Sequence, residues 1–199
     1  VTTSRILTAE FIEGIKISDF DRLESAGLDR KVITARGADL VLKQVFEHGF
    51  FHADPHPGNI FALSNNVICL IDFGMVGVVD RQTRDDFVDL LDSIAQQNET
   101  QVSEVLLKLT YWDEEPDRRL LEREVADFMG RHLYKPLKEI ELGKLLQQML
   151  EVAAEFQLRI PPDLFLMIKA LGTVEVFGYA LWQQYNNDKN FYEFNTTKN

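Results

Sequence analysis

Residues 50–60 hold the side chains in this chain that are best suited to chemistry. His52, Asp54, His56 and Asn59 lie in this proline-containing stretch, and Asp72 follows at the end of an apolar run, shortly before a glycine. Amide and carboxylate oxygens are the hard ligands that suit Mg²⁺ when it carries the phosphates of a nucleotide. Asp54 could then accept or orient the proton of an attacking hydroxyl or water. We therefore expect Asn59 and Asp72 to bind metal and Asp54 to be catalytic.

The segment that carries these residues has no positive charge. No Lys or Arg occurs between Lys43 and Arg81. Phosphates bound here would be neutralised by a metal ion and by a cation from elsewhere. Two other interpretations of the segment stay open. His52, Asp54 and His56 alternate in a way that also suits a transition-metal site, and the stretch could be an ordinary proline-rich loop.

The elements that must position this loop are a helix before it and a hairpin after it. Residues 28–48 show helical spacing of apolar side chains, with Val32, Leu42 and Val45 on the expected inward face and Gly49 as a stop signal. Residues 60–63 and 67–71 predict two strands joined by a turn at 64–66. Residues 5–14 form a further β-prone run that ends at a glycine.

Beyond Asp80 the pattern is helical almost throughout. Asp80 is the expected N-cap of a helix whose apolar stripe begins at Phe87. A second helix follows around residues 102–109, and Pro116 is expected in the first turn of a third. A fourth helix covers residues 142–156, and a last one runs from the prolines at 161–162 to about residue 185. The sequence thus predicts one α-rich unit with a small β-hairpin and a polar tail over residues 186–199.

Composition excludes several classes of protein. The chain has 199 residues, 45% of them hydrophobic, which is enough for a sizeable core. Its formal net charge of −11 argues against a general nucleic-acid binder, which needs a basic face. The single cysteine, Cys69, excludes an internal disulfide and a multi-cysteine zinc site. Residues 163–182 are apolar but carry Lys169 and Glu175, so we expect a core helix rather than a membrane span. We also expect no signal peptide.

The motifs of the loop resemble those of a known family. The pattern His52-x-Asp54-x4-Asn59, followed by Asp72-Phe73-Gly74, resembles the catalytic loop and metal-binding motif of protein-kinase-like enzymes. The longer segment from Gly49 to Ile60 is similar in sequence to the corresponding segment of the ABC1/UbiB (AarF-type) atypical kinase family. The resemblance covers nearly the whole chain, from residues 7–14 to the helix around residues 167–171.

This resemblance implies an α+β fold, namely the mostly helical C-terminal lobe of a protein-kinase-like domain. Residues 1–14 would be the hinge strand, residues 15–185 the helical C-lobe and residues 186–199 a tail. Asp54 would be the catalytic aspartate, Asn59 and Asp72 would ligate Mg²⁺ or Mn²⁺ on the nucleotide, and the backbone at Glu10 and Ile12 would contact the adenine of ATP. His52 would brace the loop.

The resemblance also implies a biological setting and a gap. The family is linked to ubiquinone biosynthesis, so the expected partners are ATP or ADP, with quinone-pathway lipids or proteins and a membrane surface as further candidates and no nucleic acid. The expected location is cytoplasmic, with peripheral attachment at the inner membrane left open. An N-terminal lobe with its phosphate-covering loop is expected to be missing from this sequence, and the cation expected from elsewhere would be the strand lysine of that lobe. We therefore expect the isolated chain to have little or no ATPase activity.

Two alternative functions remain. One is a small-molecule phosphotransferase of the aminoglycoside or choline kinase type, which shares the His-x-Asp-x4-Asn arrangement, although Ala53 and Pro55 look more like ABC1/UbiB. The other is a non-catalytic, pseudokinase-like binding module.

Overall fold

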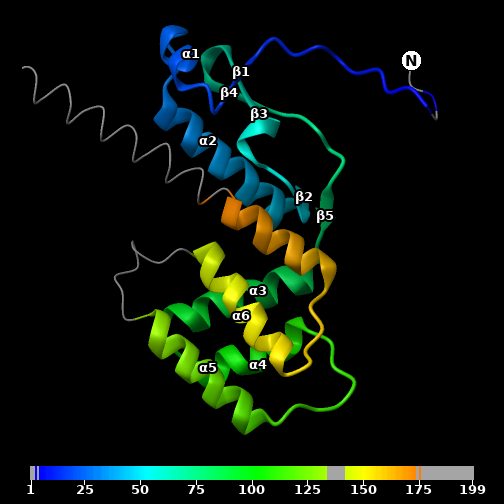
Figure 1. Cartoon of the computed structure of the whole chain (residues 1–199), viewed down its shortest axis with the longest axis vertical. Coiled ribbons are helices and arrows are strands. Elements are labelled where there is room, and N and C mark those ends of the chain that lie inside the picture. The colour runs from blue at the N-terminus through cyan, green and yellow to red at the C-terminus, as the bar shows by residue number, and fades with distance from the viewer. Residues whose placement is uncertain (1–2, 4, 134–141, 174, 176–199) are drawn as a thin grey trace, which may run out of the picture.

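The computed structural model describes residues 3, 5–133, 142–173 and 175. In chain order the labelled elements are β1 (Ile15–Lys16), α1 (Phe20–Ser25), α2 (Arg30–Leu42), the π-helix η1 (Lys43–His48), β2 (Phe50–His52), the 3₁₀ turn η2 (Pro57–Asn59), β3 (Ile60–Leu63), the 3₁₀ turn η3 (Ser64–Asn66), β4 (Val67–Leu70), β5 (Val76–Val78), α3 (Arg81–Ala95), α4 (Glu99–Leu109), α5 (Arg118–His132) and α6 (Leu142–Glu155) (Figure 1). Residues 162–173 form a further helix, orange in Figure 1, which we call the 162–173 helix. The predicted end of this helix near residue 185 and the tail lie outside the described residues.

Two small antiparallel sheets carry the β-structure. The predicted hairpin is confirmed as β3 and β4, which pair from Ile60↔Leu70 to Leu63↔Val67, and β1 joins the outer side of β3. Its turn holds Asn65 at φ 60°, a left-handed conformation that asparagine tolerates better than most residues. The second sheet, β2 with β5, was not predicted, because strands of three residues leave little periodic signal.

The strand predicted at residues 5–14 is wrong. Residues 5–14 are extended but belong to no strand, and β1 begins only at Ile15, where the chain pairs with Ala62. An extended segment becomes a strand when its backbone N–H and C=O groups pair with a neighbour, and residues 5–14 lead away from the helices instead (Figure 1). The assignment of residues 1–14 to a hinge stays a prediction.

Helices α1 to α5 begin at side-chain caps. Asp80 accepts a hydrogen bond from the Thr83 N–H, which confirms it as the N-cap of α3. The prediction that Pro116 lies in the first turn of α5 is wrong, because Pro116 precedes the helix. Asp117 caps it instead, because its carboxylate accepts from the N–H groups of Arg119 and Leu120.

The inward face of α2 also differs from the prediction. Ile33, Val41 and Val45 are buried, whereas Leu42 is 46% exposed. These buried residues are separated by multiples of four positions and so lie along one side of the helix. After Leu42 the helix continues as the wider π-helical turns of η1. Apolar residues occur on several sides of this segment, so periodicity did not identify the buried row. Gly49 ends the helix at φ 68°, as expected of a stop signal.

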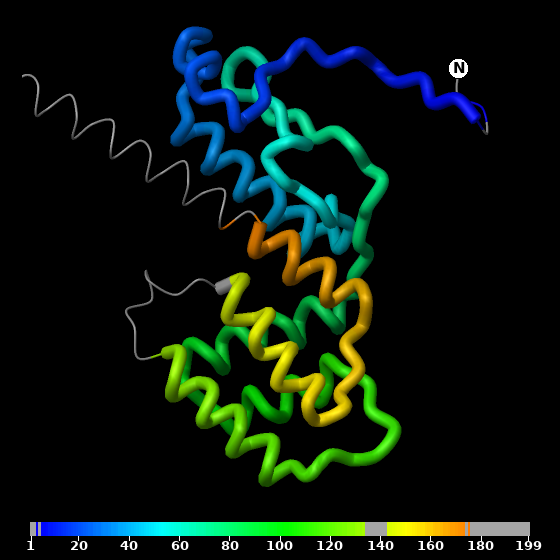
Figure 2. Tube along the Cα trace, viewed as in Figure 1, coloured from blue at the N-terminus to red at the C-terminus, as the bar shows by residue number. Residues whose placement is uncertain are grey.

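One hydrophobic cluster connects the first and second halves of the chain. It includes Val41 and Phe51 beside the loop, residues of α3–α6 such as Phe87, and Met167 of the 162–173 helix. In Figure 2 the 162–173 helix lies between α2 and the α3–α6 helices. Its Gly172 packs against Gly143 of α6. A smaller cluster under the β3–β4 hairpin contains Ile17, Leu23, Ile33, Ile60 and Ala62.

The described part of the chain is thus mostly helical with two small sheets, in agreement with the predicted α+β class. None of the helices in that part is long and apolar enough to cross a membrane.

Candidate functional site

The β2–β5 pair holds together the two segments that carry the candidate site, namely the loop after β2 and the segment before β5. Phe51 lies opposite Gly77, and a Cβ built on Gly77 would come within 2.3 Å of the Phe51 ring. Because Phe51 is fully buried, glycine is needed for this close approach. The pairing continues past the strands, where the Ala53 N–H donates to the Met75 carbonyl at 3.1 Å. The loop that follows β2 is therefore held against the segment that precedes β5.

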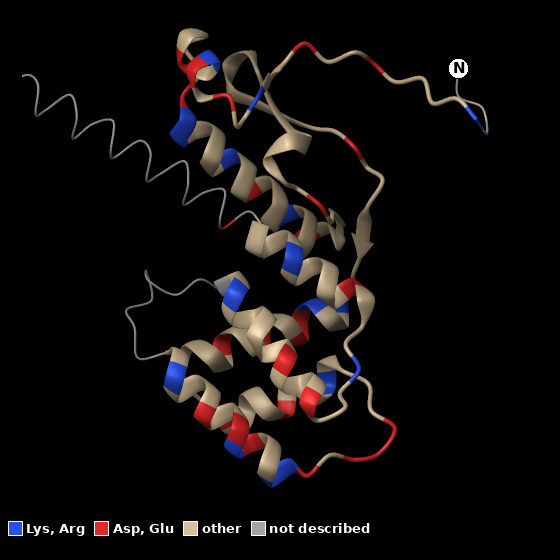
Figure 3. Cartoon of the chain, viewed as in Figure 1, with Lys and Arg blue, Asp and Glu red and all other residues tan. Residues whose placement is uncertain are grey.

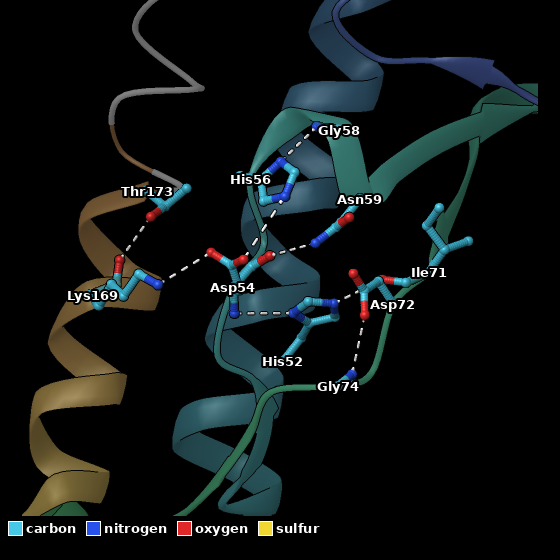
Figure 4. Close-up of polar contacts among 10 residues, drawn as sticks. All are labelled: His52, Asp54, His56, Gly58, Asn59, Ile71, Asp72, Gly74, Lys169 and Thr173. Atoms are coloured by element: carbon cyan, nitrogen blue, oxygen red, sulfur yellow. Dashed lines mark hydrogen bonds and ion pairs between the residues drawn. The ribbon is translucent and has the colours of Figure 1, made fainter. Parts of the chain in front are cut away.

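His52 joins the loop to that segment. The His52 ring is buried, its Nε2 lies 2.9 Å from the Ile71 carbonyl, and its Nδ1 lies 3.1 Å from the Asp54 N–H (Figure 4). An acceptor at Nδ1 and a carbonyl at Nε2 require the neutral tautomer with hydrogen on Nε2. These bonds place His52 as the brace that the sequence predicted. They also argue against the transition-metal alternative, because both ring nitrogens are engaged.

The backbone of Asp54 and the side chain of Asn59 are held by contacts within the loop. The Asn59 Nδ2 donates to the Asp54 carbonyl at 3.2 Å, and Asn59 is only 7% exposed. With its amide nitrogen committed to that bond, Asn59 has its Oδ1 available as an acceptor or metal ligand. The 3₁₀ turn η2 carries Asn59, and His56 starts this turn by accepting from the Gly58 N–H at its Nδ1.

Asp72 is the third member of the group. The Ile71 N–H donates to the Asn59 carbonyl at 2.9 Å, so the residue before Asp72 is fixed to the backbone of Asn59. Asp72 adopts φ 59°, a left-handed conformation that costs a non-glycine residue of the order of 1 kcal/mol. Its Oδ1 accepts from the Gly74 N–H at 3.3 Å, and the side chain is exposed. Backbone strain thus occurs at a candidate ligand.

These residues fit a hard metal ion that also binds phosphate. No cluster of three or more His, Cys, Asp or Glu with the geometry of a metal site occurs in the described part of the chain. The Asn59 amide oxygen and the Asp72 carboxylate supply oxygen ligands, but they are too few for a protein-only cage. Mg²⁺ commonly takes one or two carboxylates and fills its octahedron with phosphate oxygens and water. The donor set therefore suits a metal that arrives with a nucleotide.

Lys169 also lies at the site, a residue that sequence reasoning did not assign to it. Its Nζ lies 3.3 Å from Oδ1 of Asp54, across from the loop, on the 162–173 helix (Figure 4). The other carboxylate oxygen of Asp54, Oδ2, lies 3.8 Å from Nε2 of His56. The available signal was a single basic residue in an otherwise apolar helical stretch. It is the one blue band of that helix in Figure 3, since residues 162–173 contain no other Lys or Arg.

The structure does not bring all predicted site residues together. Asp54, Asn59 and Asp72 share one neighbourhood (Figure 4), whereas Glu10 and Ile12 lie in the extended segment 5–14 (Figure 1). Contact of their backbone with adenine stays a prediction.

Comparison with known proteins adds family information. The model of the ABC1 atypical kinase-like domain matches residues 1–106, and the model of the UbiB helical domain matches residues 125–186. An uncharacterized protein of Synechocystis is 36% identical over 93% of this chain and 32% of its own length. A probable protein kinase UbiB of Marinobacter nauticus is 31% identical over 91% of the chain and 34% of its own length.

A plant protein is similar as well. The chloroplastic protein "ACTIVITY OF BC1 COMPLEX KINASE 7" of Arabidopsis thaliana is 31% identical over 89% of this chain and 26% of its own length. The chain thus spans roughly a quarter to a third of the length of these curated relatives.

Proposed function

The chain belongs to the ABC1 atypical kinase-like family, and on that premise we propose that it is the nucleotide- and metal-binding C-lobe part of an ATP-dependent atypical kinase or ATPase. The observation that carries the proposal is the joint placement of Asp54, Asn59 and Asp72. The Asn59 side chain donates to the Asp54 backbone, and the Asn59 backbone accepts from Ile71, next to Asp72. One hydrogen-bonded unit therefore carries the two proposed metal ligands and the proposed catalytic carboxylate.

In this mechanism the Asn59 Oδ1 and the Asp72 carboxylate would hold Mg²⁺ or Mn²⁺, which would arrive with ATP. The metal ion, when bound, neutralises charge that develops on the transferred phosphoryl group. Asp54 orients the attacking hydroxyl or water and accepts its proton. The attacking oxygen forms a bond to the γ-phosphorus while the bond to the β–γ bridging oxygen breaks, so ADP leaves with that bond's electron pair.

The setting is proposed from the family alone. ATP and ADP are the proposed ligands, and isoprenoid-quinone biosynthesis at a membrane surface is the proposed context. The phosphoryl acceptor is either a second substrate or water.

Two substitutions in the full-length protein test the site. Asp72→Asn removes a metal-binding carboxylate and should abolish Mg²⁺-dependent binding of ADP, measured by calorimetry with and without Mg²⁺. Asp54→Asn should leave this binding largely intact and lower turnover about 10²- to 10⁴-fold, the range for loss of a general base. Asp89→Asn, an exposed carboxylate on α3, is the matched control and should behave as wild type.

The outcomes separate the alternatives. Unchanged ADP affinity in Asp72→Asn would remove the metal assignment. Normal turnover in Asp54→Asn would take Asp54 out of catalysis, and nucleotide binding without any turnover in the full-length protein would favour a binding module. Phosphorylation of a soluble alcohol such as choline or an aminoglycoside would favour the small-molecule phosphotransferase.

A further inference from the structure

The Lys169–Asp54 contact connects two parts of the chain that the family models treat separately. Asp54 lies in the ABC1 match at residues 1–106, and Lys169 lies in the UbiB helical match at residues 125–186. Their side chains approach to 3.3 Å between Nζ and Oδ1 (Figure 4). The helical part therefore places the Lys169 ammonium beside the Asp54 carboxylate, which is the catalytic group of the proposed function.

Lys169 lies in a mostly buried stretch of the 162–173 helix. Its neighbours Met167, Ile168 and Ala170 are buried, so Lys169 does not belong to an array of surface charges. The start of the 162–173 helix is tied to the same site, because the Val78 N–H of β5 donates to Oδ1 of Asp163 at 3.5 Å. The loop itself offers no Lys or Arg between Lys43 and Arg81. Lys169 therefore brings a positive charge to a loop that has no Lys or Arg of its own.

The ion pair is too exposed to be explained by stability. The Lys169 side chain is 37% exposed and the Asp54 side chain 33% exposed. Pairs that water can reach on both sides contribute little to the free energy of folding. The main effect of the contact is thus local: it restricts the rotation of the Asp54 carboxylate and places a positive charge beside it.

The other contacts of Asp54 leave that rotation undefined. His52 holds its N–H and Asn59 holds its carbonyl, so both fix the backbone rather than the carboxylate. Oδ2 faces His56, whose Nε2 is 3.8 Å away and beyond hydrogen-bonding distance. Lys169 makes the closer contact, to Oδ1, and leaves Oδ2 for a nucleophile.

We propose that Lys169 is a positioning residue that sets the orientation of the Asp54 carboxylate, and that the helical part thereby completes the catalytic loop. This inference rests on the proposed function. Because Lys169 acts through Asp54, its loss should reduce the rate of the chemical step more than the binding of nucleotide.

The test uses the full-length protein and four variants. Lys169→Met removes the charge, Lys169→Arg keeps it, and Lys108→Met on the exposed face of α4 is the matched control. The fourth variant combines Lys169→Met with Asp54→Asn. For each, we would measure kcat and KM for ATP hydrolysis, calorimetric affinity for ADP with Mg²⁺, and the melting temperature.

We expect Lys169→Met to lower kcat about ten- to a hundredfold, with KM and ADP affinity changed less than about twofold. Lys169→Arg should recover most of the rate, and Lys108→Met should match wild type. In the Asp54→Asn background, Lys169→Met should cause no further loss, because the two residues act as one unit. If Lys169→Met does not fold, Lys169→Gln takes its place as the uncharged variant.

Three results would overturn the inference. The first is a Lys169→Met kcat within about twofold of the Lys108→Met value. The second is an equal further loss in the Asp54→Asn background, and the third is a tenfold loss of ADP affinity, which would make Lys169 a phosphate ligand instead. Failure of the wild-type protein to bind ADP with Mg²⁺ would overturn the proposed function and this inference together, whereas normal wild-type turnover with unchanged Lys169 variants overturns only the inference.

Discussion

Replacing His52 by leucine should loosen the connection between the candidate catalytic loop and the metal-binding segment. The buried His52 ring is hydrogen-bonded to the Asp54 N–H through Nδ1 and to the Ile71 carbonyl through Nε2. Leucine fills most of the same volume but makes neither bond. The substitution therefore tests the two bonds with little loss of packing.

The expected cost follows from the groups left without a partner. An unsatisfied buried donor or acceptor costs about 1–3 kcal/mol, so two such groups give about 2–6 kcal/mol. Asp54 and Ile71 are only partly buried, and water can replace part of what each loses. We therefore expect a loss near the lower end, about 2–3 kcal/mol. This is a large share of the 5–15 kcal/mol that typically stabilises a domain.

Urea unfolding of the 199-residue chain gives this number directly. The matched control is His48→Leu, because His48 lies exposed on η1 and should change the unfolding free energy by less than about 0.5 kcal/mol. Hydrogen exchange at the Asp54 amide provides a local readout and should become faster in His52→Leu only. A His52→Leu variant as stable as His48→Leu, with unchanged exchange at Asp54, would refute the bracing role.

Two further predictions concern glycine packing and pH. A Cβ on Gly143 would lie 2.4 Å from the Gly172 backbone, so Gly143→Ala should destabilise the fold by about 1–3 kcal/mol in urea unfolding. Gly37→Ala, in the interior of α2 with open space around the new methyl group, should instead stabilise it by about 0.5–1 kcal/mol, and the same sign for both would contradict the reasoning. The Thr83 backbone N–H bound to Asp80 lowers the pKa of that carboxyl below its ordinary 3.8. Its contribution is present above that value and is lost as pH falls through the lower folded pKa. The stability difference between wild type and Asp80→Asn, measured from about pH 6 to pH 3, should therefore shrink; a constant difference would argue against this cap.

Helices with one clear apolar stripe could be predicted from the sequence, because burial on one face of a helix repeats every three or four residues. For α4 the expected inward residues Val102, Val105, Leu106 and Leu109 are all buried. The β3–β4 hairpin was predictable for a similar reason, since two β-prone runs flank a turn that asparagines favour. Local sequence suffices where the burial pattern and the turn chemistry agree.

The features that the sequence did not predict correctly depend on partners distant in sequence. β2 and β5 each have three residues, and their pairing rests on Phe51 packing over Gly77, which neither segment reveals alone. In α2 the apolar residues do not form one stripe, so the buried row was decided by what packs against it. Residues 5–14 have strand-like composition, but composition does not supply a partner strand.

The same contrast between local signals and distant partners applies to the candidate site. Asp54, Asn59 and Asp72 were predictable because their residue types and spacing lie within one short stretch. Lys169 was not, because its approach to Asp54 depends on how the 162–173 helix packs between β5 and α6. The sequence contained only a partial signal: a candidate loop without Lys or Arg, and a single basic residue in the mostly apolar stretch 162–173. A lysine among buried neighbours favours a carboxylate nearby, but only the packing of the 162–173 helix shows that this carboxylate is Asp54.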